Sequence, residues 1–424
     1  MKIRTAMKRF LAAALVCVMA LSLVACGGSG DAEEAESSEG EAVTLKFQQW
    51  WGVELPENYL QDIVDRYKEE TGVTVELISA PWADTKTAIT AGATNGTIAD
   101  IISVDGAWLA EFVDMGILAD AGAAGIDESL AGDVWKVDGT SYVVPVNNFA
   151  YPMYVNTDIL AAAGVEIPTT WSELIDACKK ITDAGYSAFA LNLGTTNANG
   201  IQNVFGGTGW ASGINLKDES GAYAVAGNED LKALAELFKT LYDDGSLYPG
   251  MATLEESEMT SNFAAGNCAF TLASAATMSQ FTDVNFEAVT VPVRDGYEGQ
   301  SGICYASWAA GISEACEHKE EAAAFLNWLL EGEDGAVSGG LASVQSAFPN
   351  STKATPDYAE APEQFQSFYE LYKENYVINE YIGLPNASAV MTSMTNDLVL
   401  YLEGDLDVDT MLTNWQGYLD EAGK

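Results

Sequence analysis

Tryptophan and aspartate side chains occupy loops that follow predicted strands. Trp50 and Trp51 come directly after the first predicted strand, and Trp82 follows the second. Asp105 and Trp108 follow the third. An indole ring offers a broad apolar surface with one N–H donor, and a carboxylate accepts hydrogen bonds. These groups are suited to binding a molecule that has apolar faces and polar edges.

Residues for common catalytic and metal-binding sites are scarce. His318 is the single histidine, so a Ser–His–Asp triad would depend on it alone and a zinc site with two histidines is impossible. Cys178, Cys268, Cys304 and Cys316 form no C-x-x-C pair. We expect buried free thiols, although an exported protein could form a disulfide. No cofactor and no metal are expected.

Composition limits the possible partners. The chain has 424 residues, 48% of them apolar, which is enough for a large core and suggests two or more domains. It carries 19 Lys and Arg against 62 Asp and Glu, a net charge of −43. Nucleic-acid binding needs a basic surface, so we expect no nucleic-acid partner.

The first 42 residues are typical of an export signal and a linker. A basic start is followed by an apolar segment, residues 10–25, that is short for a membrane span. The segment ends in Leu-Val-Ala-Cys and resembles a lipobox, which implies lipidation of Cys26 and a membrane anchor. The alternative for residues 1–26 is an ordinary cleaved signal. Residues 27–42 are rich in Gly, Ser and acids, which predicts a flexible tether.

Strands and helices alternate in the segment that carries the tryptophans. Apolar strands are predicted at residues 44–47, 73–78 and 98–104. Between the first two, apolar side chains in residues 59–67 recur at spacings of three and four, which predicts a helix ending at Gly72. Such alternation forms a parallel sheet covered on both faces, with ligands beyond the carboxyl ends of its strands. The tryptophan loops should therefore meet at one edge of a sheet.

The rest of the chain continues this pattern. A strand at residues 142–146 leads into Asn147 and Asn148, which we place at a crossing between two lobes. Trp210 ends a glycine-rich segment, residues 206–210; because no Lys-Ser/Thr follows, we expect a flexible cleft loop rather than a phosphate site. Further helices are predicted at residues 87–93, 108–115, 157–163, 171–184, 231–242 and 320–330.

A series of motifs resembles family 1 of the extracellular solute-binding proteins, the sugar-binding lipoproteins of ABC importers. The most specific match is residues 154–160 with 163–164 and 168–174. One departure is the Ser-Ala-Ala at residues 274–276, where the family often has Gly-x-Trp. Another is Asn350, which follows Pro349 in a segment where the family usually has basic residues. The other matching segments are residues 99–102, 116–118, 139–145, 263–270, 309–313 and 321–326.

The resemblance implies an α/β, two-lobe periplasmic-binding-protein-like fold of type II, with a ligand cleft between lobes joined by three crossings. We expect the crossings near residues 146–150, 302–306 and 348–352. The predicted N-terminal lobe comprises residues 43–148 plus 304–349, and the predicted C-terminal lobe comprises residues 149–303 plus 350–424.

The resemblance also implies a sugar as ligand. A sugar has C–H patches that aromatic rings can cover and hydroxyls that Asp, Asn and Gln can bind. Trp171 is assigned to a helix start and not to the site. The predicted ligand-binding residues are Trp50, Trp51, Trp82, Asp105, Trp108, Asn147, Asn148, Trp210, Ser307, Trp308 and Asn386.

The implied function is capture of a sugar or oligosaccharide outside the cytoplasm by hinge closure, and its delivery to a permease. The protein would be a lipid-anchored monomer that catalyses no reaction. One alternative is a binding protein for a polyamine, a peptide or a phosphodiester, and another is a surface sensor. A secreted glycoside hydrolase is a further alternative, because the 62 acids could include two carboxylates about 5–10 Å apart.

Overall fold

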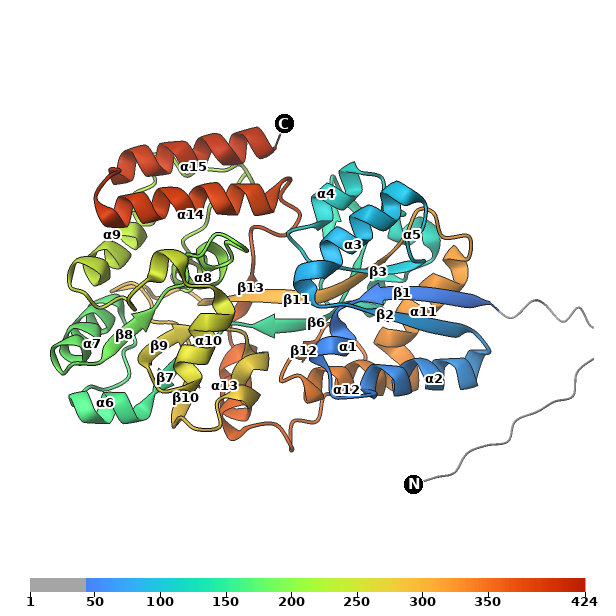
Figure 1. Ribbon diagram of the computed structural model, residues 1–424, viewed down its shortest axis with the longest axis horizontal. Helices are drawn as coiled ribbons and strands as arrows, with labels where there is room; N and C mark the ends of the chain where they lie inside the picture. Colours follow the sequence, from blue (N-terminus) through green and yellow to red (C-terminus); the bar gives the residue numbers. More distant parts are fainter. Residues whose placement is uncertain (1–42, 424) are drawn as a thin grey trace, which may run out of the picture. The chain divides into compact units, whose positions relative to one another are not determined.

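Strands and helices alternate along most of the chain in a computed structural model, which describes residues 43–423 (Figure 1). The predicted export signal with Cys26 (residues 1–26) and the predicted tether (residues 27–42) lie outside the described residues. None of the helices within residues 43–423 is both long enough and apolar enough to cross a membrane. The described strands form two larger sheets and one short hairpin.

The first sheet has the strand order β12-β6-β11-β3-β1-β2, and β13 pairs with β11 outside this path. β1 runs parallel to β2 and to β3, as predicted. β11 runs antiparallel to β3 and to β6, so the complete sheet is mixed, which the prediction of a parallel sheet did not include. The local alternation of strands and helices cannot reveal strands that join from distant parts of the chain. The strands are β1 (Thr44–Gln49), β2 (Thr74–Ser79), β3 (Ile101–Val104), β6 (Val144–Ala150), β11 (Gly302–Ile312), β12 (Phe348–Pro349) and β13 (Tyr376–Ile378).

The second sheet has the order β10-β7-β9-β8. β8 runs parallel to β9, whereas β7 runs antiparallel to both β9 and β10. A separate hairpin joins β4 and β5. These strands are β4 (Lys136–Val137), β5 (Thr140–Ser141), β7 (Met153–Asn156), β8 (Ser187–Ala190), β9 (Cys268–Leu272) and β10 (Phe286–Val289).

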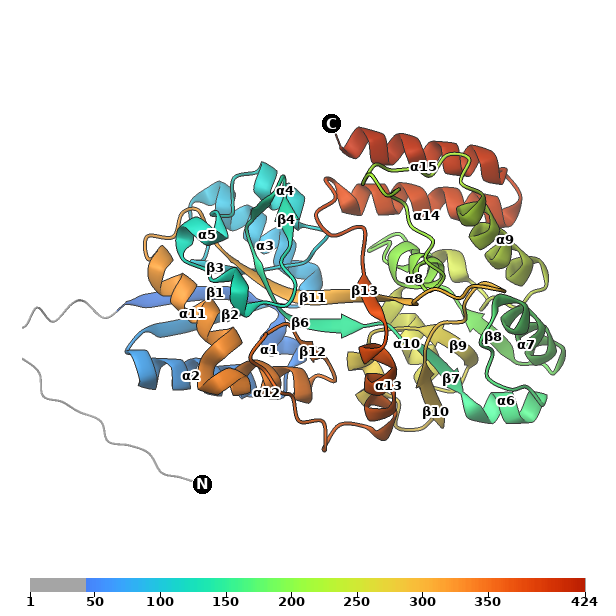
Figure 2. The same cartoon turned by 180° about the vertical axis from the view of Figure 1, so that it is seen from behind.

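Helices connect and cover these sheets. Figure 2 shows α14 and α15 running side by side, and α11 and α12 beside strands of the first sheet. The helices are α1 (Trp51–Glu54), α2 (Tyr59–Thr71), α3 (Trp82–Asn95), α4 (Leu109–Asp114), α5 (Ala121–Ala124), α6 (Thr157–Ala163), α7 (Trp171–Asp183), α8 (Gly207–Trp210), α9 (Glu229–Asp243), α10 (Glu256–Ala264), α11 (Lys319–Glu331), α12 (Ala336–Val344), α13 (Glu363–Lys373), α14 (Ala387–Glu403) and α15 (Val408–Ala422). Shorter 3-10 or π turns are η1 (Glu128–Leu130), η2 (Ile201–Gly206), η3 (Met251–Thr253), η4 (Ala275–Gln280) and η5 (Gly332–Gly335).

The local sequence determines where α2 lies and ends. Its buried side chains include Leu60, Ile63 and Val64, which the periodicity predicted to share one face. Gly72 adopts a left-handed conformation with φ +79°, and its N–H donates to the carbonyl of Lys68. Only glycine adopts this conformation without a steric penalty, so it stops the helix where predicted.

Two predictions of local structure, one for α3 and one for the glycine-rich segment, were wrong. α3 begins at Trp82, five residues before the predicted start, because Pro81 has φ −56° and a proline needs no N–H partner at a helix start. The glycine-rich segment is helical rather than a flexible loop. A Cβ on Gly209 would lie 2.7 Å from Leu234 Cδ2, so the glycine permits close packing against α9.

The buried apolar side chains form two separate cores. The first core contains Phe149, and the second core contains the next residue, Ala150. The same change of core occurs between Cys304 and Tyr305 and again at Phe348, which follows Ala347 of the first core. The chain therefore crosses between the cores in β6, in β11 and at the start of β12, which confirms the three predicted crossings.

The cysteines within residues 43–423 are all free and buried. Burial raises the pKa of the Cys268 thiol to about 12, and it raises the pKa of the Cys178 thiol even further. Both groups therefore stay protonated at neutral pH and act as small apolar side chains.

Candidate functional site

A cavity of about 1030 Å³ is lined by side chains from both hydrophobic cores. Trp50, Trp108 and Trp308 belong to the first core, and Tyr151 and Met391 belong to the second. A site in which two cores meet is typical of small-molecule binding, and this volume is at the upper end of the usual range of about 300–1,000 Å³. The cavity therefore has room for more than one sugar ring.

Trp50, Trp82 and Trp108, which follow β1, β2 and β3, meet at one wall of this cavity, so these loops share one edge of the sheet as predicted. Trp82 stacks on Trp108 with 5.5 Å between ring centroids and 26° between planes. Trp50 meets Trp108 edge-on, also at 5.5 Å. Trp50 and Trp108 expose only 3% and 4% of their surface, whereas Trp82 is half-buried. The first two therefore form a rigid support, and Trp82 presents most of the accessible ring surface.

Trp308 and Ser307, on β11, also line the cavity. Trp308 stacks on Trp51 with planes only 7° apart. Trp51 itself is fully buried and does not line the cavity, so it supports the ring in front of it. Trp308 Nε1 donates a hydrogen bond of 3.2 Å to Oε2 of Glu54.

Asp105 lines the cavity and is held by two donors. Trp82 Nε1 donates to its Oδ2 at 3.1 Å, and the backbone N–H of Ala107 donates to its Oδ1 at 2.9 Å. Burial raises the pKa of Asp105, and these two hydrogen bonds oppose that rise. The carboxylate thereby fixes the orientation of the Trp82 ring.

Sequence reasoning missed two carboxylates in this cavity, Glu54 and Glu256. Burial among protein atoms and the charge of Glu256 raise the pKa of Glu54 to about 7, against the hydrogen bond from Trp308. Burial and the charge of Asp105 raise the pKa of Glu256 to about 7, against a hydrogen bond from Asn199 Nδ2. Glu54 lies four residues after Trp50, a spacing that indicates a shared helical face, whereas nothing near Glu256 marks it in the sequence.

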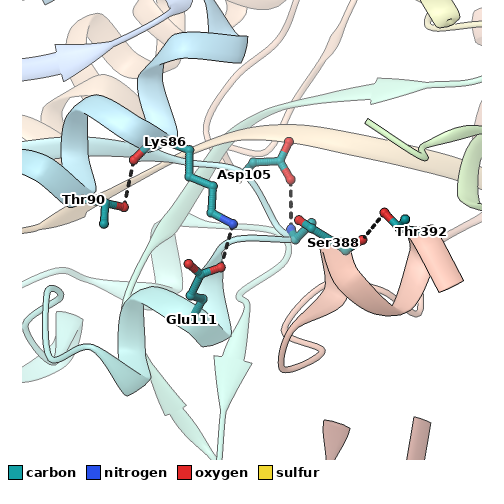
Figure 3. Close-up of polar contacts among 7 residues, drawn as sticks. Lys86, Thr90, Asp105, Glu111, Ser388 and Thr392 are labelled. Carbon is teal, nitrogen blue, oxygen red and sulfur yellow. Dashed lines mark hydrogen bonds and ion pairs between the residues drawn. The ribbon is translucent and has the colours of Figure 1, made fainter. Parts of the chain in front are cut away.

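Lys86 is the single cation among the described residues that line the cavity. Its ammonium group points to Glu111, as Figure 3 shows, and the two form an ion pair of 2.6 Å. Figure 3 also shows Ser388 and Thr392, which line the cavity from α14. Within residues 43–423, no group of three His, Cys, Asp or Glu side chains could hold a metal ion.

Amide and hydroxyl groups make up much of the remaining lining. They were missed because they lie on segments that carry no recognisable motif, apart from residues 274–276. Ser274 and Ala276 line the cavity where the related family often has a tryptophan, so small side chains leave space there. The other lining residues with amide or hydroxyl side chains include Thr196, Asn197, Asn199, Gln202, Asn203, Thr277, Ser279, Gln280, Gln345 and Ser346.

Two predicted asparagines lie beside the cavity rather than in its lining. Asn147 is fully buried on β6, opposite Trp308 of β11 and Pro349 of β12 in the strand register. Its side-chain amide has no hydrogen-bond partner within residues 43–423. Asn148 accepts a hydrogen bond from the hydroxyl of Ser307. Asn148 therefore positions a lining residue.

Two further predicted residues lie elsewhere. Trp210 is 1% exposed in the second core, and its Nε1 donates to Glu380 at 2.8 Å. The glycine-rich helix that carries Trp210 packs inward, which is why the ring does not reach the cavity. Asn386 is exposed and precedes α14 with φ +51°, while Ser388, two residues later, reaches the cavity instead.

Comparisons with known proteins agree with this arrangement. The family model described as "Bacterial extracellular solute-binding protein" matches residues 53–336. The galactooligosaccharide-binding protein of Bacillus subtilis is 24% identical over 327 residues, which cover 74% of this chain and 75% of that protein. The sn-glycerol-3-phosphate-binding periplasmic protein UgpB of Rhizobium meliloti is 26% identical over 298 residues, which cover 65% of this chain and 66% of that protein.

Solved structures show the same fold at low sequence identity. The GacH receptor of Streptomyces glaucescens superposes with a TM-score of 0.72 at 19% identity, covering 90% of this chain and 98% of the receptor. The cyclic alpha-maltosyl-1,6-maltose binding protein from Arthrobacter globiformis superposes with a TM-score of 0.71 at 20% identity, with the same coverage of 90% and 98%. The fold is thus the predicted two-lobe periplasmic-binding-protein-like fold. With its two cores, its cavity between them and a family match over most of its length, the chain belongs to the family of bacterial extracellular solute-binding proteins.

Proposed function

We propose that this protein captures a sugar or oligosaccharide outside the cytoplasm and delivers it to the permease of an ABC importer. The observation that supports this most is the composition of the cavity, in which half-buried Trp82 faces a lining rich in amides and hydroxyls. A pyranose presents C–H faces and a ring of hydroxyls, and these two kinds of lining match them.

The proposed mechanism is hinge closure at the crossings between the two cores. A ligand held by side chains from both lobes stabilises the closed form relative to the open form. Binding must be tight but reversible, and a Kd near a micromolar corresponds to about −8 kcal/mol. We assign residues 43–148 plus 304–349 to one lobe and residues 149–303 plus 350–424 to the other.

Residue roles follow from the positions of the side chains. Trp82 stacks on the ligand, with Trp50, Trp108 and Trp308 supporting or extending that surface. Asp105, Ser307 and the amides of the lining bind its hydroxyls. A lipid on Cys26 would hold the protein at the outer face of the membrane, since the strongly negative chain would be repelled by anionic lipids.

A phosphate-bearing solute is a second candidate because of the similarity to the glycerol-phosphate-binding protein. Phosphate recognition needs cations or a helix N-terminus directed at the anion. Lys86 is already paired with Glu111, and the other charged side chains of the lining are acids. The charge of the cavity therefore favours a sugar over a phosphate-bearing solute.

Isothermal titration calorimetry of the purified protein tests the proposal. The ligands are mono- and oligosaccharides, and sn-glycerol 3-phosphate represents the phosphate-bearing solutes. We expect at least one saccharide to bind with a Kd near a micromolar or below, and the phosphate compound to bind far more weakly. Chromogenic glycosides serve as the control for hydrolysis. Absence of binding by every saccharide, or release of the chromophore, contradicts the proposal.

A further inference from the structure

The described side chains that line the cavity carry an excess of negative charge. Glu54, Asp105 and Glu256 are carboxylic acids, and Lys86 is the one cation beside them. Lys86 forms its ion pair with Glu111 at 2.6 Å, and its charge also acts at longer range on Asp105, where it lowers the pKa. Within residues 43–423, none of the three acids forms an ion pair.

These acids approach the cavity from different elements. Glu54 ends α1, Asp105 follows β3, and Glu256 begins α10. They are close enough for the charge of Asp105 to act on Glu256, and for that of Glu256 to act on Glu54. This mutual repulsion adds to burial in raising the pKa of both glutamates to about 7. A cation placed among the three acids would favour their ionised forms and so lower the pKa of both glutamates.

Each acid also keeps free hydrogen-bonding capacity. A carboxylate has about four acceptor positions. Glu54 accepts one hydrogen bond, from Trp308, and Glu256 accepts one side-chain hydrogen bond, from Asn199. The acids do not form a compact metal site within residues 43–423, so their charge is spread over a space suited to an extended ligand.

We propose that the ligand is an amino sugar oligosaccharide, whose protonated amines lie against Glu54, Asp105 and Glu256 while its hydroxyls meet the amides of the lining. This inference rests on the proposed sugar function and narrows its ligand class. The indole of Trp82 adds to the attraction, because a cation is stabilised over an aromatic face. A linear polyamine would match the acids but has no hydroxyls, so it would make fewer hydrogen bonds with the amides and hydroxyls of the lining than an amino sugar would.

The test compares ligands that share a skeleton and differ in charge. Titrations of the full protein use glucosamine oligosaccharides, N-acetylglucosamine oligosaccharides of the same length and linkage, and spermidine. We expect the amine-bearing oligosaccharide to bind at least about tenfold more tightly than its acetylated counterpart at low ionic strength, with the advantage shrinking as salt is added.

A matched pair of variants assigns this preference to the cavity. Glu256→Gln should reduce the ratio of the two affinities about tenfold, whereas Glu236→Gln, an exposed position on α9, should leave it unchanged. Circular dichroism of both variants establishes that each is folded.

The outcomes separate this inference from the proposed function. Equal or tighter binding of the acetylated or any neutral saccharide overturns the inference and leaves sugar capture standing. Tighter binding of spermidine than of every saccharide contradicts both. An amine preference that survives in Glu256→Gln also overturns the inference as assigned to these carboxylates.

Discussion

At the scale of residues, the site is a layered arrangement of indole rings. Trp51 supports Trp308, and Trp108 supports Trp82, so the ring with the largest accessible surface is held from behind. Asp105 fixes the Trp82 ring through its Nε1. A ring held in one orientation before the ligand arrives loses little conformational freedom on binding, which favours affinity.

Replacing Trp82 tests this role. Trp82→Ala should weaken saccharide binding by about 1–3 kcal/mol, roughly tenfold to a hundredfold, because aromatic anchors dominate small binding surfaces. Trp328→Ala is the matched control, since Trp328 is also half-buried and its Nε1 donates a hydrogen bond of 2.8 Å to the carboxylate of Glu70. Trp328 does not line the cavity. Titration calorimetry measures both. Equal losses in the two variants would assign the effect to general destabilisation.

The raised pKa of Glu256 predicts how stability of the free protein changes with pH. Its pKa rises from 4.5 to about 7 on folding, so the folded state binds the proton more strongly than the unfolded state. The stabilising effect of the proton is present at low pH and is lost as pH rises from about 4.5 through 7. Glu256→Gln should therefore be more stable than the natural chain at about pH 8 by roughly 1–3 kcal/mol, and nearly equal at about pH 4.5.

Urea denaturation at the two pH values provides this measurement, and Glu236→Gln is again the control. A variant that is less stable than the natural chain at the higher pH would show that the Glu256 carboxylate is stabilised when ionised, contrary to the argument.

The sequence predicted the parts of the site that follow a local rule. Trp50, Trp82, Asp105 and Trp108 could be placed because strand ends of parallel strands share an edge. Glu256 could not, because it reaches the cavity only through the packing of α10 against the second sheet. Trp210 was misplaced because the glycines in its segment permit close packing of a helix, whereas the sequence suggested a flexible loop.

At the scale of elements, local signals determined most helix boundaries. α6 begins and ends at the predicted residues, because Asn156 caps its first turn and Gly164 has a positive φ of 66°. The pairing of β11 with β3 and β6 could not be predicted, because it joins segments far apart in the chain. Long-range pairing depends on the whole fold rather than on the pattern of one strand.

The close packing of β11 leads to a prediction on stability. A Cβ on Gly311 would lie 2.7 Å from the carbonyl oxygen of Tyr142, so Gly311→Ala should destabilise the protein by about 1–3 kcal/mol. Gly417→Ala is the control, since nothing lies within 4 Å of the added carbon in the exposed part of α15. It should stabilise the protein by about 0.5–1 kcal/mol. Thermal unfolding of both variants decides, and a stable Gly311→Ala would contradict the packing argument.

At the scale of the whole molecule, two cores meet at a cavity and are connected through β6, β11 and the start of β12. These three backbone crossings are the covalent links between the cores within residues 43–423. In the proposed hinge closure, rotation about them would change the cavity with little change inside either core. The fold class could be predicted from motif order, whereas the lobe boundaries remain a prediction.

Small-angle X-ray scattering of the protein with and without a saturating saccharide tests the central claim most directly. Closure of the two lobes over a captured sugar predicts a smaller radius of gyration in the presence of ligand, with no change on adding a saccharide that titration shows not to bind. Scattering curves that superimpose at full saturation would contradict capture by hinge closure.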